Sequence, residues 1–66
     1  MKKISYFTIL PEGDYLVNFK KPEPYFGNDP LPAHIIPCGP RNRIDIKWNN
    51  GYSARMDRKH VNIWTI

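Results

Sequence analysis

The chain has 66 residues, of which 41% are hydrophobic and 24% charged, and its ten Lys and Arg against six Asp and Glu give a formal charge of +4. Ordering each residue costs about 1.5 kcal/mol of chain entropy, so a domain of this size has little burial left with which to hold a deep catalytic cleft. We therefore expect one domain over residues 1–66, with neither enzymatic activity nor a cofactor.

The single cysteine, Cys38, excludes an internal disulfide, whereas small secreted domains usually need several. Residues 1–13 begin with two lysines and a short apolar run, but the run alternates with polar residues and lacks a small-residue cleavage site, unlike a signal peptide. No stretch approaches the roughly 20 apolar residues that cross a bilayer. These features favour a cytoplasmic protein without membrane contact.

The first predicted element is a β-hairpin. Residues 4–10 and 15–19 are rich in β-branched and aromatic side chains, and they flank turn residues at 11–14. With Glu12-Gly13 at the tip, both faces of the hairpin are partly apolar. Such a hairpin is expected to bend strongly or to be covered by another segment.

The middle of the chain, residues 20–42, is predicted to be a long, stiff loop. It holds six of the seven prolines, and proline is excluded from helix interiors and from central strands. Its apolar residues indicate that the loop packs against the rest of the domain. Within it, residues 33–36 can pair briefly as an edge strand.

A second hairpin is predicted more firmly, because residues 43–48 alternate polar and apolar and are followed by Asn49-Asn50-Gly51. A two-residue turn would place Arg55 opposite Ile46 and force a charge onto the apolar face. A three-residue loop with Gly51 in the left-handed region avoids this. The resulting register pairs Trp48 with Tyr52, Lys47 with Ser53, Ile46 with Ala54, Asp45 with Arg55, and Ile44 with Met56.

The last elements are short. Residues 57–60 are expected to form one helical turn with Asp57 as its cap. Residues 61–66 then form a closing strand, with Val61 and Ile63 facing inward and Trp64 outward. No helix of ordinary length is predicted.

Strand, tight turn, strand, helical turn and closing strand follow one another over residues 43–66, on Ile44, Ile46, Trp48, Asn50-Gly51 and the turn at 57–61. This order resembles the C-terminal half of SH3-like small β-barrels, including Tudor and KOW-type modules. The resemblance implies an all-β, antiparallel, partly open barrel with a long proline-rich loop and one short helical turn. It also implies a binding face formed by the first hairpin and the long loop.

Metal binding and nucleophilic catalysis are not expected. His34, Cys38 and His60 are the only soft metal ligands, and a structural zinc site usually needs four. Cys38 lies between Pro37 and Gly39-Pro40, where no helix N-terminus would activate its thiol. We therefore assign no catalytic residue and no metal ligand.

The leading functional hypothesis is a non-enzymatic binding module, a regulator or inhibitor that docks onto a larger protein. Rigid proline-flanked segments lose little entropy on docking, and the predicted partner-binding residues are Tyr25, Phe26, Leu31 and Trp64. Small basic domains of this kind are frequent among regulators carried by phages and mobile elements. The larger protein on which the module docks would then be one that handles nucleic acid. The sequence also allows a homodimer that pairs through an edge strand.

The alternative hypothesis is direct DNA or RNA binding. Six of the ten basic side chains lie in the last 26 residues, and Trp64 or Phe26 would stack on bases. Asp45 and Asp57 lie in the same region and weaken its positive field. The predicted nucleic-acid-binding residues are Arg43, Lys47, Arg55, Arg58 and Lys59.

Overall fold

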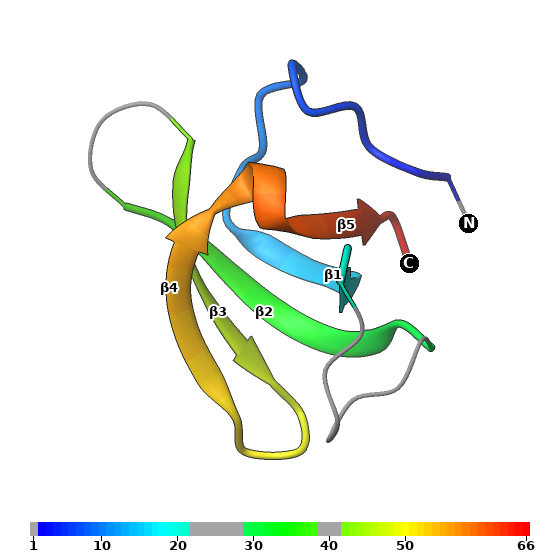
Figure 1. Cartoon of the computed structure of the whole chain (residues 1–66), viewed down its shortest axis with the longest axis vertical. Coiled ribbons are helices and arrows are strands. Elements are labelled where there is room, and N and C mark those ends of the chain that lie inside the picture. The colour runs from blue at the N-terminus through cyan, green and yellow to red at the C-terminus, as the bar shows by residue number, and fades with distance from the viewer. Residues whose placement is uncertain (1, 22–28, 39–41) are drawn as a thin grey trace.

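The computed structural model describes residues 2–21, 29–38 and 42–66, and in these residues a single five-stranded antiparallel sheet curls into a half-barrel (Figure 1). The elements are β1 (Gly13–Phe19), β2 (Leu31–Pro37), β3 (Arg43–Trp48), β4 (Ser53–Asp57), the 3-10 turn η1 (Arg58–His60) and β5 (Val61–Trp64). The strand order is β4-β3-β2-β1-β5. The predicted fold class, an all-β partly open barrel with one short helical turn, is confirmed.

The β3–β4 hairpin has the predicted register. Ile44, Asp45, Ile46 and Lys47 each lie opposite the expected partner on β4, and the Trp48 amide donates to the Tyr52 carbonyl at 2.8 Å. Gly51 has a φ of +94°, in the left-handed region that glycine enters without strain. The alternation of apolar and polar residues therefore determines both the loop length and the face of each side chain.

The connection between β4 and β5 also follows the prediction. The Asp57 carboxylate accepts a hydrogen bond from the Lys59 amide at 2.9 Å and so caps η1. In β5, Val61 and Ile63 are buried, and Trp64 is half-buried on the other face. The strand ends at Trp64, two residues earlier than predicted.

The predicted first hairpin is wrong. β1 begins at Gly13, inside the predicted turn, and both of its edges are occupied, one by β2 and the other by β5. Residues 4–10 therefore find no strand to pair with on β1. The segment forms backbone hydrogen bonds with the outer edge of the sheet, where Lys3 bridges Trp64 and the Ile4 amide donates to the Ile63 carbonyl at 2.8 Å.

The prediction that residues 20–42 form a loop with at most an edge strand is wrong for β2, the central strand of the sheet. Its prolines lie where a ladder ends. Pro32 lies beyond the last β2–β3 pair, and its carbonyl still accepts a hydrogen bond from the Asn49 amide at 3.0 Å. Pro37 is the final residue of β2, two positions beyond the β1–β2 ladder. Neither proline removes an interior hydrogen bond. The rest of the predicted loop, at 22–28 and 39–41, lies outside the described residues.

The core fills the concave side of the sheet. Val17, Ile35, Ile44 and Ile46 are fully buried, and Trp48 packs beside them with its indole N–H donating to the Val17 carbonyl at 3.2 Å. This bond satisfies the polar atom that burial of a tryptophan would otherwise leave unpaired.

In the described ranges, no helix is long and apolar enough to cross a bilayer.

Candidate functional site

Residues 2–12 form an ordered segment that runs past η1 and β5 before entering β1 (Figure 1). Arg58 is only 6% exposed, and its guanidinium donates hydrogen bonds to the carbonyls of Ser5, at 2.9 Å, and Thr8. The Thr8 amide donates to the same Ser5 carbonyl at 3.0 Å and closes a turn. One buried cation thus fixes the backbone of the segment through its carbonyl oxygens.

Further contacts hold the segment on either side of this turn. The Tyr6 hydroxyl accepts a hydrogen bond from the Asn42 side chain at 2.8 Å and donates to Asp57 at 3.4 Å. Leu10 is buried in the core. The Tyr15 hydroxyl donates to the Pro11 carbonyl at 2.7 Å. Residues 5–11 are therefore tied to β1, to η1 and to the residue before β3.

Two large apolar side chains project from this fixed segment. Phe7 is 90% exposed and Ile9 is 89% exposed, although both belong to residue types that usually lie inside a domain. Phe7 meets the Tyr6 ring edge-on at 5.4 Å between centroids. We call Phe7 and Ile9 the apolar tip.

Positive charge flanks the apolar tip. A hollow of about 220 Å³ on one side brings Phe7 and Ile9 together with Arg43. A second hollow, of about 530 Å³, brings Ile9 together with Lys2 and Lys3. No carboxylate of the described residues lines either hollow. The apolar tip therefore lies in a positive rim.

The polar groups that support the segment have shifted pKa values. Burial lowers the pKa of the Arg58 guanidinium, because the interior solvates its charge less well than water does. The guanidinium nevertheless stays protonated, as arginine does throughout proteins. The hydrogen bond from the Lys59 amide lowers the pKa of the Asp57 carboxyl, because it favours the ionised form. Both groups are therefore charged at neutral pH.

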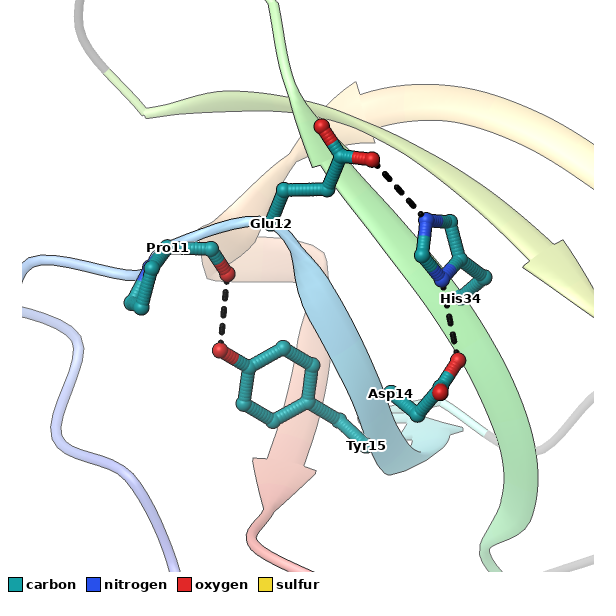
Figure 2. A network of polar contacts seen from close by, with 5 residues as sticks. All are labelled: Pro11, Glu12, Asp14, Tyr15 and His34. Atoms are coloured by element: carbon teal, nitrogen blue, oxygen red, sulfur yellow. Dashed lines mark hydrogen bonds and ion pairs between the residues drawn. The ribbon is translucent and has the colours of Figure 1, made fainter.

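A second polar cluster lies where the segment joins β1. Figure 2 shows the His34 imidazole of β2 between two carboxylates, with Asp14 2.9 Å from Nδ1 and Glu12 3.2 Å from Nε2. The hydrogen bond to Asp14, and then the one to Glu12, raises the pKa of His34. Lys47 is the register partner of His34 on β3, so the two side chains lie on the same face of the sheet. The imidazolium form can donate to both carboxylates at once, so protonation ties residue 12 to the sheet.

Two of the four predicted partner-binding residues, Leu31 and Trp64, lie in the described part of the chain, on different strands. Leu31 lies in β2 and packs partly buried against the core. Trp64 is half-buried at the sheet edge, with the Lys3 ammonium 6.0 Å from its ring centre. Tyr25 and Phe26 lie outside the described residues.

The predicted basic patch is only partly assembled. Arg43, Lys47 and Arg55 do share the exposed face of the β3–β4 hairpin. Arg55 donates to both oxygens of Asp45, at 2.7 and 3.2 Å, and this contact raises the pKa of Arg55 and lowers that of Asp45. The remaining two residues of the predicted patch, Arg58 and Lys59, belong to η1, and the guanidinium of Arg58 faces inward onto Ser5 and Thr8.

The candidate metal ligands are also separated. Within residues 2–21, 29–38 and 42–66, no group of three or more His, Cys, Asp or Glu side chains could hold a metal ion. Both ring nitrogens of His34 are hydrogen-bonded, one to Asp14 and the other to Glu12. Cys38 is half-buried after the end of β2, and its amide donates to the Arg43 carbonyl at 3.1 Å.

The sequence reasoning missed the apolar tip because it paired Phe7 and Ile9 with residues of β1. One signal was present. A hairpin over residues 4–19 would have been apolar on both faces, and a two-stranded ribbon cannot bury two faces alone. That surplus of apolar residues is what the structure leaves exposed on Phe7 and Ile9.

No protein-family profile matches this chain, and comparison with curated proteins and with solved structures finds no match either. Function must therefore be argued from the geometry of the described residues.

Proposed function

We propose that this protein is a non-enzymatic binding module that docks onto a larger protein and regulates or inhibits it, with the apolar tip as its anchor. The observation that carries the proposal is the near-complete exposure of Phe7 and Ile9 on a segment whose backbone a buried arginine holds. Burying an exposed Phe or Ile side chain contributes roughly 1.5–3 kcal/mol. Two such side chains in one partner pocket would form a binding hot spot.

The fixed backbone strengthens this argument. A flexible segment loses conformational entropy when a partner orders it, and that loss subtracts from the affinity. Here the Arg58 contacts and the turn at Ser5–Thr8 hold the segment in the free protein. Docking of Phe7 and Ile9 would therefore cost little further ordering.

The surroundings of the tip indicate the chemistry of the partner. Arg43 lies on one side, and Lys2 and Lys3 lie on the other. The complementary surface is an apolar pocket with acidic residues at its rim, because opposite charges steer encounter and exclude wrong partners.

The test is capture from a host lysate, with and without nuclease, on the immobilised full chain. We expect a captured protein to survive nuclease treatment and to be depleted at least about tenfold by the double substitution Phe7→Ala and Ile9→Ala, because each side chain supplies over ~1 kcal/mol. Tyr52→Ala is the matched control, because Tyr52 is also an exposed large hydrophobic residue, 44% exposed, but lines neither hollow beside the apolar tip.

Three results would contradict the proposal. Equal capture by the double variant and by wild type removes the role of the apolar tip. Loss of capture after nuclease treatment favours direct nucleic-acid binding. A concentration-dependent dimer that the double variant abolishes would show that the tip binds a second copy of this chain.

A further inference from the structure

A groove lies between the N-terminal segment and the start of β5, on the other side of Arg58 from the apolar tip. Its volume is about 330 Å³, within the ~300–1,000 Å³ typical of small-molecule sites. Residues 3–6 of the N-terminal segment and Lys20, just after β1, line it. Arg58, Val61, Asn62 and Ile63 line the remainder.

The groove is positive. Lys3, Lys20 and Arg58 line it, and no carboxylate of the described residues does. A second groove, of about 450 Å³, adjoins it by sharing Lys20. That groove adds Lys21, Lys59 and His60 to two apolar residues, Phe19 and Met56.

Arg58 is the feature that separates this groove from an ordinary lysine-bearing surface. It is more than nine-tenths buried, and within the described part of the chain its guanidinium forms no ion pair with a carboxylate. Its two terminal nitrogens donate to main-chain carbonyls, while its buried Nε has no hydrogen-bond partner there. A buried charge without a counter-ion is costly, and an anion placed nearby reduces that cost.

We propose that this groove binds a phosphate group. The flexible ammonium groups of Lys3 and Lys20 would contact the phosphate oxygens, the Ser5 hydroxyl would donate a hydrogen bond, and Arg58 would supply fixed positive charge behind them. Lysine binds phosphate as a point charge on a flexible stem, so Lys3 would leave its cation–π contact with the Trp64 ring, 6.0 Å from the ring centre, to reach a phosphate in the groove.

The phosphate could be a monoester on a small molecule or a phosphodiester in a nucleic-acid backbone, since both present the same oxygens. The adjoining groove extends the line of cations past Lys20 to Lys21 and Lys59, and Phe19 adds an apolar wall. A strand of nucleic acid would use both grooves, whereas a small phosphate would occupy only the first. The groove shares Lys3, Ser5 and Arg58 with the hollows beside the apolar tip, but neither Phe7 nor Ile9 lines it.

The test uses the ¹⁵N-labelled full chain at constant ionic strength, titrated with inorganic phosphate in one arm and with a thymidine oligonucleotide lacking terminal phosphates in the other. We expect the amide signals of Ser5, Lys20 and Asn62 to move with saturation, while that of Ser53 on β4 stays in place. Movement with inorganic phosphate alone identifies a monoester site. Movement with the oligonucleotide extending to Lys59 identifies a backbone site. Uniform small shifts, or none in either arm, overturn the proposal.

A charge-matched pair of variants makes the test sharper. Lys20→Glu and Lys47→Glu change the net charge equally, and Lys47 is exposed on β3 outside both grooves. We expect the affinity to fall about tenfold or more for Lys20→Glu, because a charge-assisted contact is lost, and at most about twofold for Lys47→Glu, through screened long-range charge. Equal losses would mean attraction by net charge alone and would overturn the site.

Two further variants keep the result interpretable. Lys20→Gln removes the charge without reversing it, and it should weaken binding in the same direction if the glutamate variant unfolds. The double substitution Phe7→Ala and Ile9→Ala should leave phosphate binding unchanged. Failure of partner capture and failure of phosphate binding are therefore distinguishable.

Discussion

The β3–β4 hairpin and the N-terminal segment are stabilised by opposite arrangements of the same kinds of residue. In the hairpin, Ile44 and Ile46 are buried and the charged pair of Asp45 and Arg55 faces solvent. At segment 2–12 the buried residue is charged, Arg58 of η1, whose guanidinium holds the segment's carbonyls, while Phe7 and Ile9 of the segment face solvent. Most of the buried core therefore belongs to the sheet, whereas the N-terminal segment leaves two large apolar side chains exposed to solvent.

The largest effect expected is on the sheet. Ile46→Ala should reduce the free energy of unfolding by about 2–5 kcal/mol, because it leaves a cavity at a fully buried position. Ile9→Ala makes the same chemical change at an 89% exposed position and should leave stability unchanged within about 0.5 kcal/mol. Urea unfolding followed by tryptophan fluorescence measures both. A comparable loss for Ile9→Ala would mean that the apolar tip is part of the core.

The next effect sharpens the role of Arg58. Arg58→Met should cost about 1–3 kcal/mol, because the Ser5 and Thr8 carbonyls lose a charged donor. Amide hydrogen exchange should quicken first at residues 5–8, with the sheet still protected. Lys59→Met is the control in the same turn, since Lys59 is exposed. Uniform loss of protection across β1 to β5 would show that Arg58 supports the sheet and not the segment alone.

A smaller effect concerns the loop of the hairpin. Gly51→Ala should destabilise the protein by about 1–2 kcal/mol, because a φ of +94° brings a Cβ close to the backbone carbonyl. The space around Gly51 is open, so the loss is a backbone effect. Gly13→Ala is the comparison, because Gly13 has no positive φ and a new Cβ there would meet the Tyr15 ring at an ordinary 3.6 Å. Thermal unfolding of both variants should show a smaller loss of stability for Gly13→Ala. The reverse order would contradict the left-handed assignment of Gly51.

The smallest effect is the pH dependence at the junction of the two regions. Because contacts with Asp14 and Glu12 raise the folded-state pKa of His34 above its ordinary 6.5, the folded protein holds that proton more tightly than the unfolded chain. The resulting stabilisation is complete below the unfolded value and disappears as pH rises through the folded value. Melting temperatures from about pH 5 to about pH 9 measure it. His34→Gln should flatten this part of the profile, and an unchanged profile would refute the role of His34.

The fold was predictable where local pattern and turn chemistry agree. The alternation over residues 43–48, together with Gly51, allowed only one register without a charge on the apolar face, and the structure has that register. The Asp57 cap was predictable for a similar reason, because the hydrogen bond lies within the turn itself. Of the candidate site, the sequence indicated only that residues 4–10 carried more apolar surface than a two-stranded ribbon could bury.

The sequence by itself thus determined the all-β class, the β3–β4 register and the turn before β5, since each depends on residues close along the chain. The tertiary structure alone decided that β2 lies at the centre of the sheet, that β1 pairs with β2 and β5, and that Phe7 and Ile9 face solvent. These choices are set by competition between distant segments for the two edges of β1. Local residue patterns do not determine which distant segment pairs with each edge of β1.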